Sequence, residues 1–165
     1  RVPKKPQQLA KLSRPRLYDA LPRERLFTLL DEKRKHPGIW IAAPPGSGKT
    51  TLLASYVESR NLPCLWYQLD SADSDPATFF YYLSLAERLR PGRRSHEKTL
   101  PVLSPEYLSE LRGFARRQFR ELFVRLGHPS LFVIDNCQEL SPTSLVHDVL
   151  RVALEEAPEG ACVAI

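Results

Sequence analysis

The chain contains no methionine and no long apolar run. The missing methionine indicates that a natural start is absent, so we expect a trimmed N-terminus and a fragment of a longer protein. No stretch approaches the roughly 18 apolar residues that a membrane-spanning helix needs. The basic, proline-rich N-terminus has no apolar segment behind it that would act as a signal peptide. These absences predict a cytoplasmic protein.

Disulfide and metal-binding patterns are also absent. The three cysteines, Cys64, Cys137 and Cys162, lie far apart and form no C-x-x-C pair. This spacing indicates free, mostly buried thiols in a reducing compartment. The four histidines show no metal-ligand spacing either. Neither a disulfide framework nor a structural zinc site is therefore expected.

The chain does contain enough apolar residues for one core. Of its 165 residues, 42% are hydrophobic and 26% are charged, as is typical of a single folded domain. Residues 1–60 hold 13 lysines and arginines against 5 acidic residues, whereas residues 61–165 hold 11 against 14. The basic N-terminal part fits either a nucleic-acid contact or a solvated arm next to a phosphate site.

The order of apolar and polar segments predicts strands that alternate with helices. Four prolines favour an extended basic arm over residues 1–22, and we expect the nucleotide-binding domain to cover residues 23–165. The expected strands are 39–43, which reads as buried, 64–69, 131–134 and 161–165. The expected helices are 23–36, 49–59, 76–89, 104–127 and one that opens at 141. This alternation predicts an α/β fold with a parallel sheet.

The segment from Ala43 to Thr51 carries the strongest chemical signal. Residues 43–50 read APPGSGKT and match the P-loop pattern, except that Ala43 replaces the first glycine. Glycines let backbone N–H groups approach phosphates closely, and the N-terminus of the following helix adds partial positive charge. The pattern predicts a binding site for a nucleoside triphosphate, ATP above all. Its members are Pro45, Gly46, Ser47, Gly48, Lys49, Thr50 and Thr51.

Four residues carry the predicted chemistry. Lys49 is expected to reach the β- and γ-phosphates and Thr50 to offer its hydroxyl to Mg²⁺. Asp135 follows an apolar strand and is the predicted second Mg²⁺ ligand. The next residue, Asn136, can hold a water but cannot take its proton. We therefore name Lys49, Asp135 and Asn136 as catalytic candidates and expect slow hydrolysis.

Two more acids follow the second expected strand. Asp70 and Asp73 lie at the carboxyl edge of the sheet, where ligands bind in such folds. They either assist the metal and the water or serve as loop and capping residues.

Several segments resemble one known family. The first is Lys11 to Pro15 followed by Pro22 to Leu26, and the second is Leu65 to Asp70 followed by Asp73, Asp75-Pro76, Phe79 and Tyr82-Leu83. The third is Phe132 to Asp135, which is similar to a Walker B strand that usually ends in two acids. Together they resemble the large ATP-binding LuxR-type regulators, the maltose-regulator-like members of the STAND class of signalling ATPases.

The resemblance implies a nucleotide switch. It implies a P-loop NTPase three-layer sandwich of the additional-strand type, truncated after the fourth strand, with that strand between the P-loop strand and the Asp135 strand. It also implies a base pocket at Pro22, Arg23 and Arg25, unless these residues only begin a salt-bridged surface helix. An ADP-bound resting form and an ATP-bound form that self-associates belong to such proteins, and their DNA contacts lie in domains beyond residue 165.

Two other hypotheses remain at this stage. A small P-loop kinase would need an arginine-rich lid, for which Arg90, Arg93 and Arg94 are the candidates. A nucleic-acid-binding module would use the basic residues 1–25.

Overall fold

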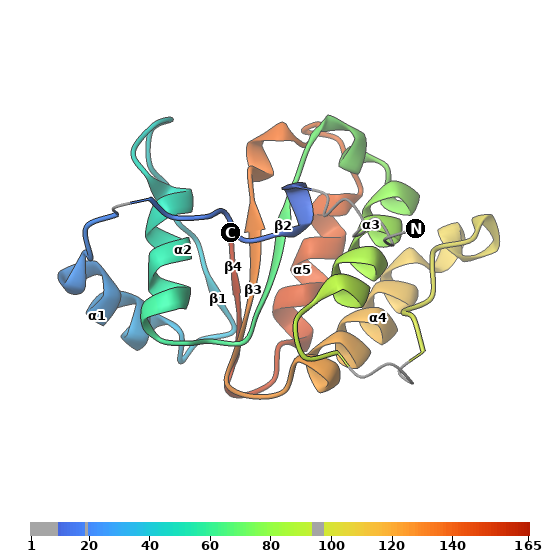
Figure 1. Ribbon diagram of the computed structural model, residues 1–165. Coiled ribbons are helices and arrows are strands. Elements are labelled where there is room, and N and C mark those ends of the chain that lie inside the picture. Colours follow the sequence, from blue (N-terminus) through green and yellow to red (C-terminus); the bar gives the residue numbers. More distant parts are fainter. Residues whose placement is uncertain (1–9, 19, 94–97) are drawn as a thin grey trace, which may run out of the picture.

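The computed structural model describes residues 10–18, 20–93 and 98–165 (Figure 1). Its four strands form one parallel sheet in the order β1-β4-β3-β2. The strands are β1 (Gly38–Ile39), β2 (Cys64–Gln68), β3 (Ser130–Asp135) and β4 (Ala161–Ala164). The α/β class, the parallel sheet and the position of the final strand between the P-loop strand and the Asp135 strand are therefore confirmed.

In the described ranges, five α-helices cover the two faces of the sheet. They are α1 (Glu24–Lys33), α2 (Lys49–Ser59), α3 (Pro76–Leu89), α4 (Leu111–Leu126) and α5 (Val146–Glu156). In Figure 1, α1 and α2 lie on one side of the sheet and α3, α4 and α5 on the other, which gives three layers. Among the described residues, no helix is long and apolar enough to cross a membrane.

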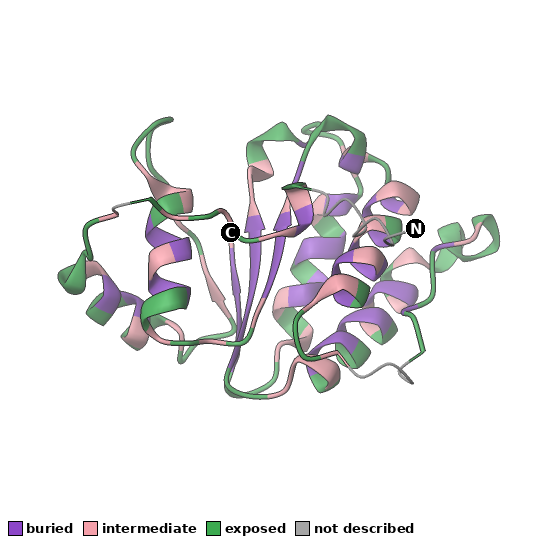
Figure 2. Cartoon of the chain, in the orientation of Figure 1, coloured by how far each residue is buried: buried purple, intermediate pink, exposed green. Residues whose placement is uncertain are grey.

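Side-chain alternation along the strands divides the core between these two faces. In β3, Leu131 and Val133 belong to the cluster that α2 covers, whereas Phe132 and Ile134 belong to the larger cluster under α3, α4 and α5. Figure 2 shows β2, β3, β4 and the inward sides of these helices as mostly buried, whereas β1 is intermediate. Since successive side chains point to opposite faces of a strand, Asp135 continues the row of Leu131 and Val133 on the α2 face.

Three predicted boundaries were wrong. The strand expected over 39–43 is regular only over Gly38–Ile39, although the Ile41 N–H still donates to the Ile165 carbonyl at 2.7 Å. It is not buried, because β1 lies at the edge of the sheet, and Trp40 is 69% exposed. The helix expected from 104 begins with a six-residue 3-10 helix that buries no side chain, and α4 starts at Leu111. The helix expected from 141 starts at Val146, because Ser141 and Ser144 are hydrogen-bonded to Ser74 and hold a turn there.

A short N-terminal segment is fastened to the carboxyl end of β2. The 3-10 helix η1 (Ala10–Leu12) places the Lys11 ammonium 2.7 Å from Asp70 and 2.8 Å from Asp73. The Asp73 carboxylate is fully buried and also accepts a 2.6 Å hydrogen bond from the Tyr67 hydroxyl. We call Lys11, Asp70, Asp73 and Tyr67 the lysine clasp. Because Asp70 and Asp73 also form the capping box of η2 (Ser71–Ser74), they act as clasp and capping residues.

Replacing Lys11 by methionine is expected to lower the free energy of unfolding by about 3 kcal/mol, because it leaves a buried carboxylate without its cation. The hydrogen bond from Lys11 also holds the pKa of Asp70 below its ordinary value. A depressed folded-state pKa stabilises the fold above the unfolded-state pKa, and that stabilisation is lost as pH falls through the folded-state pKa. Urea titrations of both proteins at neutral and acidic pH measure both effects.

The control for this substitution is Lys33→Met. Lys33 is exposed on α1, so its replacement should change stability by less than about 0.5 kcal/mol. Equal stabilities of the Lys11 and Lys33 variants would contradict a stabilising role for the clasp.

Candidate nucleotide-binding site

The loop between β1 and α2 has the backbone shape of a phosphate cradle. Gly46 and Gly48 adopt φ values of 76° and 82°, in the left-handed region that side chains disfavour. The Ser47 N–H donates to the Pro44 carbonyl at 3.2 Å and tightens the turn. Gly48 is the N-cap of α2, so the first N–H groups of that helix have no acceptor within the helix and are available to an anion.

Lys49 reaches back into the loop. Its ammonium donates to the Ala43 carbonyl at 2.6 Å and to the Pro44 carbonyl at 3.2 Å. Both contacts use backbone oxygens, so the side chain at position 43 does not enter into them. This explains how alanine can replace the first glycine of the motif. A phosphate in the loop would offer Lys49 oxygens with a full negative charge in place of neutral carbonyls.

Thr50 and Asp135 meet across the sheet edge. The Thr50 hydroxyl donates to the Asp135 carboxylate at 2.7 Å, although 85 positions separate them. A hydroxyl and one carboxylate are oxygen donors of the kind that Mg²⁺ takes together with phosphate oxygens and water. No group of three or more histidine, cysteine or acidic side chains in the described part of the chain could hold a metal alone. The donor set therefore fits Mg²⁺ delivered with a nucleotide.

Asn136 follows Asp135 in an uncommon conformation. Its φ of 61° and ψ of 37° are left-handed, which asparagine and aspartate tolerate better than most residues. Its N–H donates to the Asp135 carboxylate at 2.9 Å, and its side-chain oxygen accepts a 3.4 Å hydrogen bond from Gln138. The residue thus fixes one Asp135 oxygen and carries a neutral amide.

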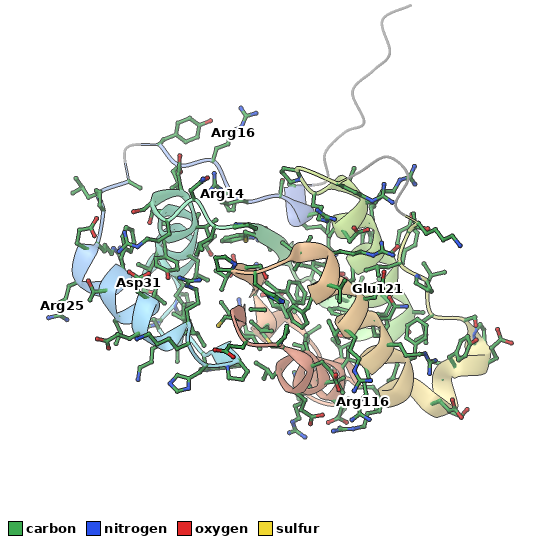
Figure 3. The ribbon with its side chains drawn as sticks, turned by 90° about the horizontal axis from the view of Figure 1, so that it is seen from below. Arg14, Arg16, Arg25, Asp31, Arg116 and Glu121 are labelled. Carbon is green, nitrogen blue, oxygen red and sulfur yellow. The ribbon has the colours of Figure 1, made fainter. Side chains whose placement is uncertain are left out.

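The two predicted base-pocket arginines lie differently. Arg23 reaches the loop: its guanidinium lies 3.5 Å from the Ser47 carbonyl, and one of its nitrogens would lie 3.0 Å from a Cβ at Gly48. Arg25, on α1, is exposed, and Figure 3 shows it pointing away from the rest of the molecule. Pro22 is exposed before α1. The structure therefore brings Arg23 to the predicted site and leaves Arg25 outside it.

A cavity of about 1070 Å³ opens beside the loop. Lys49, Asp135 and Asn136 line it, together with Pro45 and the exposed indole of Trp40. Its size is at the upper end of the range for small-molecule sites. Thr51 is exposed one residue beyond Thr50 in the first turn of α2.

Two relevant residues were noted in the sequence only as members of the resembling segments and were given no chemical role. Lys11 closes the clasp, and Gln68 pairs in register with Asp135. The register between β2 and β3 would have identified Gln68. A sequence predicts where the strands lie in the chain, but it does not show which residues of two strands face each other.

Comparison with known proteins agrees with this geometry. The family model described as AAA domain matches residues 33–158. The chain is 30% identical over 156 residues to the HTH-type transcriptional regulator MalT of Serratia proteamaculans (strain 568), covering 92% of this chain and 16% of that protein. It is 32% identical over 155 residues, with the same coverage, to the protein of that name from Klebsiella pneumoniae (strain 342). The chain thus spans about a sixth of these relatives, and the resemblance to the maltose-regulator-like proteins is confirmed.

Proposed function

The chain belongs to the AAA domain family, and from this premise we propose that it binds ATP or ADP with Mg²⁺ as the switch domain of a signalling ATPase. The observation that carries the proposal is the meeting of Thr50 with Asp135 at 2.7 Å, beside a loop that holds the Lys49 ammonium. Sequence-distant residues are brought together there in the arrangement that phosphate and metal need.

The residues have separate tasks in this proposal. The N–H groups of the loop and of the first turn of α2 bind the phosphates, and Lys49 neutralises their outer charge. Thr50 and Asp135 hold Mg²⁺, which when bound neutralises charge on the β- and γ-phosphates. Arg23 reaches the Ser47 carbonyl from the start of α1, and we propose that it contacts the rest of the nucleotide.

The wider role rests on similarity to proteins named as transcriptional regulators. We propose a cytoplasmic regulator in which ATP favours self-association of the whole protein and DNA is contacted by other domains. The kinase alternative loses support because Arg90 and Arg93 form ion pairs with the buried Glu87, which does not suit a mobile lid. Arg94 lies outside the described residues, as do residues 1–9 of the basic arm.

Calorimetric titration with ATP, ADP and GTP in the presence of Mg²⁺ tests the proposal. We expect saturable one-to-one binding of ATP and ADP. Heats that do not exceed those of dilution for all three nucleotides at millimolar concentration would rule out the switch function.

Removing Mg²⁺ is expected to weaken ATP binding about tenfold, since one carboxylate and one hydroxyl lose the ion that joins them to the phosphates. Asp135→Asn should reduce this dependence to about twofold or less. Titrations in Mg²⁺ and in EDTA, for both proteins, give the comparison. An unchanged Mg²⁺ dependence in Asp135→Asn would remove Asp135 from the metal site.

A further inference from the structure

In the described part of the chain, three acids near the candidate site, besides the metal ligand Asp135, are already engaged by other groups. Asn136 is neutral, its backbone N–H donates to Asp135, and its side-chain oxygen already accepts a hydrogen bond from Gln138. Asp70 and Asp73, which follow β2, bind Lys11, Tyr67 and the capping box. Asp148, which lines the cavity beside the loop, is paired with Arg151 at 3.1 Å. Hydrolysis of ATP at the site therefore needs another group to orient the water.

Strand register brings one more polar side chain to the metal ligand. Gln68, the last residue of β2, is the direct partner of Asp135 in the parallel β2–β3 ladder. Neighbouring strands lie about 4.8 Å apart, so the two Cα atoms are close neighbours at the carboxyl edge.

Gln68 also lies on the correct face of the sheet. It continues the alternate row of Cys64 and Trp66, which packs with α2. Asp135 is on the same face, where the Thr50 hydroxyl of α2 reaches it. The Gln68 side chain thus starts next to Asp135, on the side from which α2 presents Thr50.

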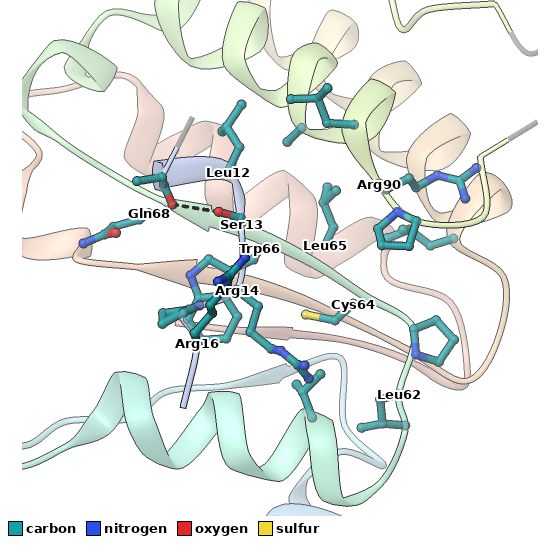
Figure 4. A pocket seen from close by; sticks show the side chains of 18 residues that line it. Leu12, Ser13, Arg14, Arg16, Leu62, Cys64, Leu65, Trp66, Gln68 and Arg90 are labelled. Carbon is teal, nitrogen blue, oxygen red and sulfur yellow. Dashed lines mark hydrogen bonds between the residues drawn. The ribbon is translucent and has the colours of Figure 1, made fainter. Parts of the chain in front are cut away.

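The amide of Gln68 is available for a ligand. No hydrogen bond joins its side chain to any described residue, and the residue is half-buried. It lies at the rim of a groove of about 690 Å³ that runs along β2 beneath the N-terminal segment (Figure 4). The groove gives solvent access to the amide, and with it a route for water.

We propose that Gln68 positions the water that attacks the γ-phosphate of bound ATP, in the place that an acidic residue after Asp135 would otherwise serve. The proposal rests on the proposed nucleotide site. In the step, the water oxygen bonds to the γ-phosphorus and the bond from that phosphorus to the β–γ bridging oxygen breaks. ADP leaves with that electron pair, and both water protons remain on the released phosphate. Gln68 accepts a hydrogen bond from the water and exchanges no proton, so it sets geometry and leaves turnover slow.

The test compares Gln68→Leu and Gln68→Glu with the wild type in single-turnover hydrolysis of ATP with Mg²⁺. Gln68→Leu should lower the rate about tenfold with an unchanged dissociation constant for ATP. Gln68→Glu should restore the rate to at least the wild-type value and add an acidic limb to its pH profile, because a carboxylate loses its basic form on protonation. If Gln68 served only folding, its replacement would leave the pH profile unchanged, and any loss of rate would come with a lower thermal midpoint.

Cys64→Ala is the matched control, since Cys64 lies on the same face of β2 and lines the same groove at its opposite end. It should leave the rate within about twofold of the wild type. Rates within twofold for both Gln68 variants, with ATP binding intact, overturn the role of Gln68. Loss of ATP binding in the wild type would instead overturn the nucleotide site itself.

Discussion

Replacing Lys49 by alanine is expected to weaken ATP binding by 100- to 1,000-fold. The ammonium lies within the loop and bonds two neutral carbonyls at 2.6 and 3.2 Å. In the complex it would face the β- and γ-phosphates, and charged hydrogen bonds there are worth about 3–4 kcal/mol in sum. That free energy corresponds to a factor of roughly 100 to 1,000 in the dissociation constant. Calorimetry of the wild type and of Lys49→Ala provides the measurement.

A second variant and a stability measurement separate binding from folding. Lys49→Ala also removes two hydrogen bonds within the free loop, so its thermal midpoint must accompany the titration. Lys49→Arg keeps the charge, but a planar guanidinium does not reproduce a compact ammonium, so we expect intermediate affinity. If Lys49→Ala folds normally and binds ATP as the wild type does, the phosphates do not contact this lysine.

Asn136→Asp is expected to raise single-turnover hydrolysis about 100-fold, the lower end of the range for general-base assistance. The wild-type rate should lie well below roughly 1 s⁻¹, because the neutral amide cannot take a proton from water. The left-handed backbone at this position favours the test, since aspartate adopts φ near 61° as asparagine does.

The left-handed backbone at Asn136 also determines which variant can serve as the control. Alanine at a φ of 61° would add strain, so Asn136→Gly is the matched variant that removes the side chain without forcing the loop. Its rate should stay near that of the wild type if the amide contributes little. Fast wild-type turnover that persists in Asn136→Gly would contradict a slow switch and direct attention to Gln68.

The features that the sequence predicted correctly depend on short-range residue patterns. Gly46, Gly48 and Lys49 occupy the loop and helix start that their spacing predicts, and Asp75 caps α3 through the Thr78 N–H. These features depend on neighbours a few residues away. The position of β4 between β1 and β3 came from family resemblance, and the sheet confirms it.

The features that the sequence did not predict depend on contacts between elements far apart in the chain. Trp40 reads as part of a buried strand, yet β1 lies at the edge of the sheet and leaves it exposed. The start of α5 depends on bonds from Ser141 and Ser144 to Ser74, far away in the chain. In each case the deciding partner lies on another element, and residue periodicity carries no information about it.

The two tryptophans lie in different environments and can serve as intrinsic fluorescence probes. Trp40 lines the cavity beside Lys49 and is 69% exposed, whereas Trp66 lies between the sheet and α2 and is 3% exposed. Their emission should differ in wavelength and in quenching by acrylamide, with Trp40 red-shifted and accessible and Trp66 blue-shifted and protected. Single-tryptophan versions made by Trp→Phe replacement would therefore follow nucleotide arrival and the packing beneath the N-terminal segment as two independent signals, without any attached dye.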